Sequence, residues 1–267
     1  MVRGLAIFQE WFKDFESQYV LIGGTAALIT MTEAGLPFRG TKDLDIVLHV
    51  EVLTPAFGKQ FWEFVKAGDY QQKEGDSQQK PCLYRFQKPR DEEFPHTLEL
   101  FSRVPDGLSF VPSGHLTPIP IGEKVSSLSA ILLDDTYYQF VLSGRNNKHG
   151  MPSWIGEDRL IPLKAVAWME MTQRVEQGEE IDLKKINKHL NDIVLLSALL
   201  QPGQVIDLPE KIKSDLQAFA KFVVEINRSE QVQAMRRIAS SFAFDLPNNE
   251  GYLKVAAAIQ KFTDMSI

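Results

Sequence analysis

The stretch that decides the fold runs from Tyr19 to Val50 and reads YVLIGGTAALITMTEAGLPFRGTKDLDIVLHV. Its opening apolar residues are typical of a short buried strand, and a glycine pair ends that strand. The pattern predicts three consecutive elements: a strand over 19–22, a helix over 25–32 and, after a turn, a strand over 41–50. We expect the rest of the chain to be organised around this unit.

Two aspartates, Asp43 and Asp45, lie in the second predicted strand. Side chains alternate across a strand, so both carboxylates point to one face while Leu44, Ile46 and Leu48 point to the other. Two adjacent carboxylates repel each other, and a fold keeps such a pair when a cation lies between them. Mg²⁺ suits the pair because it prefers oxygen ligands and shares them with substrate phosphates. An isolated Asp-x-Asp is more often a solvated strand edge, but the apolar opposite face argues against an exposed edge here.

The glycine turn, Gly23 and Gly24, lies where the strand becomes the helix. A backbone without side chains can approach a ligand closely, and the N–H groups of the first helical turn favour phosphate. Thr25 adds a hydroxyl at or near the predicted N-cap. Alone, this turn is equally consistent with a tight strand-to-helix connection that binds nothing.

Together these residues, Gly-Gly-Thr-Ala, a helix and then Thr41-Lys42-Asp43-Leu44-Asp45, resemble the nucleotidyltransferases of the DNA polymerase β type. The long helix and turn between Gly24 and Asp43, with Arg39 before the Thr-x-Asp, are most similar to the AbiEii-type toxin branch. The resemblance covers about the first hundred residues and a later helical piece. It implies that the Gly-Gly turn holds a nucleoside triphosphate. It also implies that Asp43, Asp45 and a third carboxylate on a neighbouring strand hold two Mg²⁺ or Mn²⁺ ions.

The third carboxylate is expected at Glu99, within the predicted strand 96–103. An acid between Leu98 and Leu100 needs a partner, because an isolated buried carboxylate is costly. That partner is either a basic side chain or the metal ions, and both alternatives are open. The family more often has Asp at this position. His96 opens the same strand and has no assigned role.

Cations for the triphosphate come from the resemblance as well. It implies that Arg39, Lys42 or Lys164 neutralises the charge on the leaving pyrophosphate. Lys164 would otherwise be a solvated helix residue. Lys188 and Asp192 match a later motif of the same branch, or form a surface ion pair four residues apart, and their role is open.

Composition limits the remaining possibilities. The chain has 267 residues, 44% of them hydrophobic, with a formal net charge of −6. A single cysteine excludes an internal disulfide, and five scattered histidines give no zinc spacing. The sequence has no apolar run of transmembrane length and no signal peptide pattern, so we expect a cytoplasmic protein without a membrane partner.

The fold class expected is α+β, with a nucleotidyltransferase-like domain over 1–150 that has a mixed sheet, and an all-helical domain over 151–267 that closes the cleft. The boundary is placed in the polar segment 144–156. The other predicted elements are helices over 5–16 and 54–67, an exposed loop over 71–81, strands over 81–87, 125–134 and 136–143, a loop over 104–122, and helices over 160–177, 182–200, 208–228, 230–244 and 248–264.

The predicted function is Mg²⁺-dependent transfer of a nucleotide from an NTP to an acceptor hydroxyl. The resemblance points to the toxin of a toxin–antitoxin, or abortive-infection, system, with a cognate antitoxin as partner and RNA, notably tRNA, as acceptor. Net negative charge opposes nucleic-acid binding, so an RNA acceptor would need local basic groups. The candidates are Arg145, Lys148, His149, Arg236 and Arg237. An antibiotic-modifying transferase and an inactive scaffold are the alternatives.

Overall fold

The structure is a computed structural model that describes residues 2–72, 84–103, 134–201, 203, 205–225 and 229–243. The helices are α1 (Leu5–Phe12), α2 (Gly23–Glu33), α3 (Pro55–Ala67), α5 (Asp135–Ser143), α6 (Glu157–Glu176), α7 (Leu183–Leu196), α8 (Glu210–Glu225) and α9 (Ser229–Ser241), with 3₁₀ turns η1 (Glu16–Gln18) and η2 (Ser197–Leu199). The strands are β1 (Tyr19–Ile22), β2 (Asp43–Leu48), β3 (Gln71–Gln72), β4 (Tyr84–Gln87), β5 (Thr97–Phe101), β6 (Arg145–Asn146) and β7 (Trp154–Ile155).

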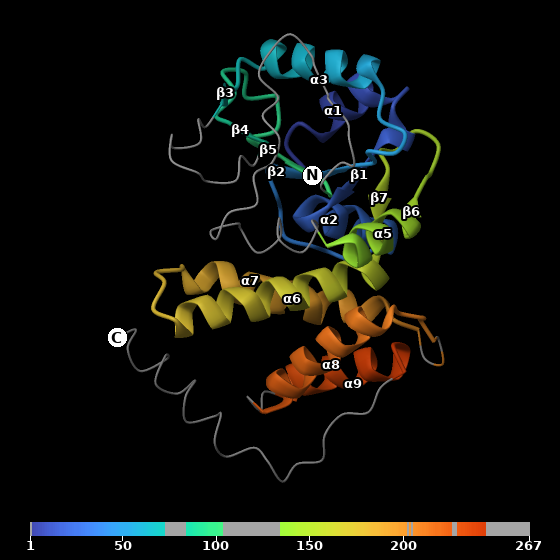
Figure 1. Cartoon of the computed structure of the whole chain (residues 1–267), viewed down its shortest axis with the longest axis vertical. Coiled ribbons are helices and arrows are strands. Elements are labelled where there is room, and N and C mark those ends of the chain that lie inside the picture. The colour runs from blue at the N-terminus through green and yellow to red at the C-terminus, as the bar shows by residue number, and fades with distance from the viewer. Residues whose placement is uncertain are drawn as a thin grey trace. The chain divides into compact units, whose positions relative to one another are not determined.

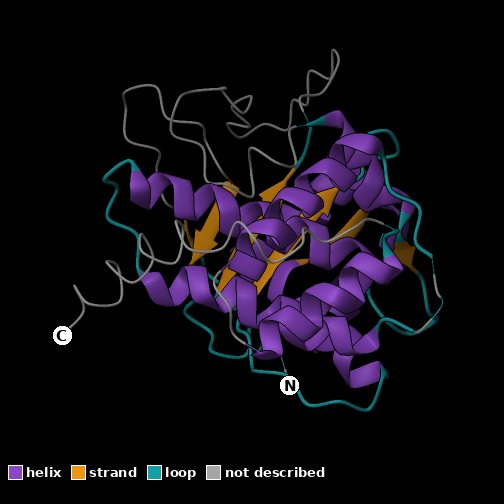
Figure 2. Cartoon of the chain, turned by 90° about the horizontal axis from the view of Figure 1, so that it is seen from below, coloured by secondary structure: helices purple, strands orange, loops and turns teal. Residues whose placement is uncertain are grey.

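The strands of the described residues form one mixed sheet in the order β3-β4-β5-β2-β1-β7-β6, drawn in orange in Figure 2. β2 is antiparallel to β1 on one side and parallel to β5 on the other. β7 is parallel to β1, whereas β4 is antiparallel to β5. The predicted α+β class and the mixed sheet are therefore confirmed.

Helices cover the two faces of the sheet (Figure 1): α1 and α3 lie on one face, and α2 and α5 on the other. Aromatic rings fill the layer under α1 and α3. Phe8 contacts Tyr19 and Phe64 edge to face, with ring centroids 5.3 and 5.7 Å apart, and all three side chains are fully buried. Such pairs add to the free energy gained by burying the rings, so this layer anchors β1.

Local sequence explains the ends of the central helices. Thr54 caps α3 by accepting a hydrogen bond from the Phe57 N–H, and Pro55 occupies the first helical position. α2 includes both glycines of the turn and extends over 23–33 rather than the predicted 25–32. It ends at Glu33, and the chain turns away at Gly35, whose φ of 71° is one that glycine adopts at little cost.

The predicted strand over 136–143 is wrong, because this segment forms helix α5. Its tyrosines, phenylalanine and valine favour a strand by intrinsic preference. Asp134 decides otherwise, since its side chain accepts hydrogen bonds from the N–H groups of Thr136 and Tyr137 and so caps a helix. The preceding predicted strand lies almost wholly outside the described residues.

The segment 144–156 contains two short strands, β6 and β7, that extend the sheet beyond β1. Trp154 and Ile155 are buried, which fixes β7 in the sheet. The chain divides into two compact units, 1–160 and 161–267. The division falls inside α6, ten residues after the predicted boundary between residues 150 and 151. The seven strands formed by the described residues all belong to the first unit.

The described part of the second unit consists of α7, α8, α9, η2 and most of α6. Trp168 of α6 packs edge to face on Phe219 and Phe222 of α8, with ring centroids 5.5 and 5.3 Å apart. None of the described helices is long and apolar enough to cross a membrane. Of the loop predicted over 71–81, residues 71 and 72 form β3 instead, and the rest lies outside the described residues. The strand predicted over 81–87 is described from residue 84, as β4. The loop over 104–122 and the helix over 248–264 lie outside the described residues.

Candidate functional site

Three chain segments meet at one edge of the sheet: the end of β1, the start of β2 and the start of β5. Asp45 is in register with Ile22 of β1 on one side and with Glu99 of β5 on the other. Asp43 is in register with Thr97. Because neighbours in register share a face of the sheet, Asp43, Asp45 and Glu99 point to the same side, which is the arrangement expected from the sequence.

The glycine turn lies directly against this carboxylate face. A side chain at Gly23 would collide with the Asp45 carboxylate, and Gly23 has a φ of 65°, so both space and conformation require glycine there. A β-carbon at Gly24 would lie 3.1 Å from Thr41 Oγ1 and 3.6 Å from Arg39 Nη2. The first turn of α2, the Arg39 guanidinium and the Asp45 carboxylate are therefore neighbours.

Thr25 has a different place from the one expected. The N-cap of α2 is Ile22, which makes no side-chain cap, and Thr25 is the third residue of the helix. Its side chain is fully buried, and its hydroxyl donates to the Asp43 carbonyl oxygen at 2.8 Å. Thr25 thus fastens α2 to the start of β2 and holds the glycine turn beside the carboxylate strand.

The Asp43 side chain is 42% exposed, so its carboxylate is accessible to solvent. Its Oδ1 lies 3.8 Å from Nδ1 of His96, and this ring nitrogen is also 3.0 Å from the Thr97 hydroxyl. The backbone N–H of His96 donates to the Lys42 carbonyl oxygen at 2.9 Å, and this hydrogen bond joins the start of β5 to the start of β2. His96 therefore borders the site, and the exposed Lys42 side chain lies on the residue before Asp43.

Glu99 has a basic partner on the neighbouring strand. Arg85 of β4 is in register with it, and the guanidinium donates to Glu99 Oε1 through Nε, at 2.6 Å, and through Nη2. This is one of the two alternatives that the sequence left open. The described residues contain no group of three His, Cys, Asp or Glu side chains placed to hold one metal ion.

A smaller donor set remains for a divalent cation. Asp43 and Asp45 offer oxygen ligands on one face, and Mg²⁺ commonly takes one or two carboxylates and completes its coordination with water and substrate phosphates. The residues present fit Mg²⁺ in that way. Glu99, already bonded to Arg85, is less suited as a third ligand.

The later candidates lie in the second unit. Lys164 is 5% exposed and donates to Asp192 Oδ2 at 2.8 Å, and Asp192 is 1% exposed. The pair ties α6 to α7, so Lys164 is not a solvated helix residue. Asp192 is bonded to Lys164, which lies in another helix, while Lys188 is exposed. Breaking a buried ion pair of this kind strongly destabilises a protein, so both residues have a structural role.

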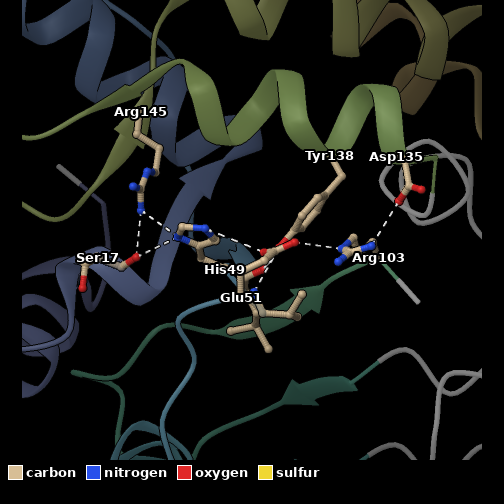
Figure 3. A network of polar contacts seen from close by, with 9 residues as sticks. Ser17, His49, Glu51, Arg103, Asp135, Tyr138 and Arg145 are labelled. Atoms are coloured by element: carbon tan, nitrogen blue, oxygen red, sulfur yellow. Dashed lines mark hydrogen bonds and ion pairs between the residues drawn. The ribbon is translucent and has the colours of Figure 1, made fainter. Parts of the chain in front are cut away.

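A second polar cluster, missed by sequence reasoning, lies at the far end of β2, about 20 Å from Asp43 by the rise of a strand. Figure 3 shows its labelled members, which come from five different segments: Ser17, His49, Glu51, Arg103, Asp135, Tyr138 and Arg145. Each residue is unremarkable in the sequence, and only the fold brings them together. We call this group the far-end network.

Glu51 and Tyr138 form the centre of the far-end network (Figure 3). The Tyr138 hydroxyl lies 2.7 Å from Glu51 Oε2 and accepts from the Val50 N–H at 2.9 Å. Arg103 Nε donates to Glu51 Oε1 at 2.9 Å. Burial disfavours the charged form of Glu51, but hydrogen bonds and the Arg103 charge outweigh it and lower the pKa of this carboxyl. Glu51 is thus a charged side chain that links the ends of β2 and β5 to α5 through its hydrogen bonds with Arg103 and Tyr138.

The basic groups proposed to hold an RNA backbone are partly engaged elsewhere. Arg145 donates to the Ser17 carbonyl oxygen at 2.7 Å and lies 3.3 Å from His49 Nδ1, within the far-end network. Lys148 forms an ion pair with Glu33 of α2. Arg236 and Arg237 are exposed on α9. Arg145 therefore lies at the opposite end of β2 from the candidate site.

No family model, curated protein or solved structure matches this chain.

Proposed function

We propose that the chain is a Mg²⁺-dependent nucleotidyltransferase that acts through Asp43, Asp45 and the glycine turn of α2. The observation that supports this most is the position of Asp45. Its carboxylate lies against Gly23, at the N-terminus of α2, and in register with a third acid, Glu99. A carboxylate strand next to an N-terminal helical turn places a cation site beside a phosphate site. The nucleotidyltransferase resemblance implies the same pairing.

In this proposal each residue has a defined task. Asp43 and Asp45 would hold the divalent cation, which supplies charge neutralisation and activation of the acceptor hydroxyl when bound. Gly24 leaves the α2 N–H groups open to close approach by phosphate oxygens. Arg39, next to Gly24, is placed to balance the charge that develops on the leaving pyrophosphate. Thr25 positions the turn without touching the substrate.

The reaction joins the acceptor oxygen to the α-phosphorus and breaks the bond between the α-phosphorus and the oxygen that links it to the β-phosphorus. The hydroxyl proton passes to a carboxylate of the site, and pyrophosphate leaves. Lys164 has no part in this proposal, because it is buried and paired with Asp192. The toxin role, the antitoxin and the RNA acceptor are carried by the resemblance alone.

Nucleotide binding tests the site. Each NTP at millimolar concentration with Mg²⁺ is expected to raise the melting temperature, because a ligand that binds only the folded state stabilises it. Gly24→Val is expected to remove that shift, since a branched side chain covers the first turn of α2. The matched control is Gly40→Val, because Gly40 lies in the same connection but has open space around it and no positive φ. Loss of the shift in both variants, or in neither, would contradict the assignment of the glycine turn.

The acceptor is tested separately by salt dependence. If RNA is the acceptor, incorporation of label into RNA should fall steeply between about 50 and 200 mM salt, because phosphate contacts release counterions. Arg236→Ala with Arg237→Ala should reduce it, whereas exposed Lys59→Ala should not. Label confined to aminoglycosides or lincosamides would instead favour the antibiotic-modifying alternative.

A further inference from the structure

Arg85 is a charged residue of the carboxylate face to which the proposed function gives no task. It lies on β4, in register with Glu99, which is in register with Asp45. Arg85, Glu99 and Asp45 therefore form one row across three adjacent strands, on one face of the sheet. The row places a guanidinium two strands away from the proposed cation ligand.

The contact between Arg85 and Glu99 leaves most of the guanidinium available. Both hydrogen bonds go to the same oxygen, Glu99 Oε1, through Nε and Nη2. A guanidinium has five N–H donors, and within the described residues the other donors of Arg85 have no hydrogen-bond acceptor. The Arg85 side chain is 38% exposed and that of Glu99 only 16%. Glu99 thus holds the inner edge of a guanidinium whose outer edge faces solvent.

The ion pair between Arg85 and Glu99 favours a single divalent cation at this face. Glu99 Oε1 already accepts from the Arg85 guanidinium. A second metal ion held by Glu99 would have to displace Arg85 from that oxygen. A planar guanidinium group binds phosphate through two parallel hydrogen bonds. It can therefore neutralise the phosphate charge that a second metal ion would otherwise neutralise.

We propose that the site takes one divalent cation, held by Asp43 and Asp45, and that Arg85 supplies the second positive charge by binding a phosphate group of the NTP, with Glu99 as its positioning residue. This inference rests on the proposed function and refines it. It replaces the expectation of two metal ions with one ion and a guanidinium. Glu99 then acts on the nucleotide through Arg85 and holds no metal.

Metal counting tests the inference independently of activity. The full chain is titrated with Mn²⁺ in the presence of a non-hydrolysable α,β-methylene NTP. Electron paramagnetic resonance counts the Mn²⁺ bound to the protein, and the Mn²⁺ held by nucleotide free in solution is left out of the count. We expect one Mn²⁺ per chain for wild type and for Glu99→Gln, and none for Asp45→Asn. Two Mn²⁺ per chain in wild type, or loss of Mn²⁺ from Glu99→Gln, would overturn the inference.

Nucleotide affinity gives the second readout. Arg85→Met is expected to weaken binding of the same analogue by roughly tenfold or more, because a charge-assisted bidentate contact is lost. Arg85→Lys, which keeps the charge, should recover part of the affinity, and Glu99→Gln should weaken binding without changing the Mn²⁺ count. The matched control is Arg90→Met, an exposed arginine in the turn that follows β4. Equal affinities for Arg85→Met and wild type would overturn the role of Arg85.

The two proposals fail in different ways. If wild type binds neither the analogue nor Mn²⁺, the proposed function is wrong, whatever Arg85 does. If wild type binds both and Asp45→Asn binds neither, the proposed function stands, and the Arg85 variants alone decide the further inference. Circular dichroism and the melting temperature of each variant separate loss of binding from loss of folding.

Discussion

Tyr19 and Tyr138 are both fully buried tyrosines, but the environments of their hydroxyl groups are opposite. Tyr138 bonds Val50 and Glu51, whereas the Tyr19 hydroxyl has no hydrogen-bond partner among the described residues. Burial raises the pKa of both side chains, so each hydroxyl stays protonated at ordinary pH. The same chemical change at the two positions should therefore have opposite effects on stability.

Tyr19→Phe is expected to raise the free energy of unfolding by about 1 kcal/mol, because it removes a buried polar group without a partner. Tyr138→Phe is expected to lower it by about 1–3 kcal/mol, because the buried Val50 N–H loses its acceptor. Urea denaturation of the two variants beside wild type measures both changes. A shift of the same sign in both would show that the hydroxyl environments are not as described.

Glu170 provides a pH test in the second unit. Burial raises the pKa of this carboxyl to about 7, with the charge of Asp215 adding to the effect and Arg174 and Lys211 opposing it. A folded-state pKa above the unfolded value stabilises the protein at low pH, and this contribution is lost as pH rises from the ordinary value of 4.5 toward 7.

Glu170→Gln should therefore match wild type in free energy of unfolding below pH 4.5 and exceed it above pH 7. The expected gain is about 1 kcal/mol, since solvent screening reduces the effect of a partly exposed group. Urea denaturation at a series of pH values gives the curve. A gain that is the same at every pH would mean that the carboxyl does not titrate abnormally.

At the residue scale, period-two alternation was enough to place Asp43 and Asp45 on one face, because that pattern is local. The partner of Glu99 could not be predicted in the same way. Arg85 reaches it through the register of β4 on β5, and pairing between strands is set by packing and by connections that sequence alone does not show. The same reason hides the far-end network.

At the scale of elements, α5 shows how a single cap overrides strand preference. Asp134→Ala is expected to lower the free energy of unfolding by about 1 kcal/mol, because two N–H groups of the first turn lose their acceptor. The matched control is Asp135→Ala, which removes an exposed carboxylate from the next residue. Chemical denaturation compares the two. An equal or larger loss in Asp135→Ala would contradict the capping role of Asp134.

Other elements were predictable because their signals are local. The apolar periodicity and Thr54-Pro55 start of α3 agree with the structure to within a residue. Strands β6 and β7 have two residues each and belong to the sheet only through pairing with β1 and each other, so the polar segment 144–156 resembles a linker in sequence. Short edge strands of this kind carry too few residues for a periodic pattern.

At the scale of the molecule, hydrophobic periodicity together with the nucleotidyltransferase resemblance predicted the α+β class and the mixed sheet, but composition and periodicity could not assign a function. The candidate site brings together segments more than seventy residues apart, from Ile22 to Glu99, and the fold supplies that proximity. Net charge of −6 would oppose long-range attraction of RNA, so acceptor choice depends on local groups.

The central claim is that Asp43, Asp45 and the glycine turn transfer a nucleotide. The most direct test is incubation of the full chain with Mg²⁺, total cellular RNA, protein extract or small-molecule acceptors, and each NTP labelled on either the α- or the γ-phosphate. We predict that α-label enters an acceptor, that γ-label is released as pyrophosphate, and that Asp45→Asn reduces transfer by a factor of about 100 or more. The exposed control Asp14→Asn should keep wild-type transfer. Transfer of γ-label, or undiminished transfer of α-label by Asp45→Asn, would contradict the claim.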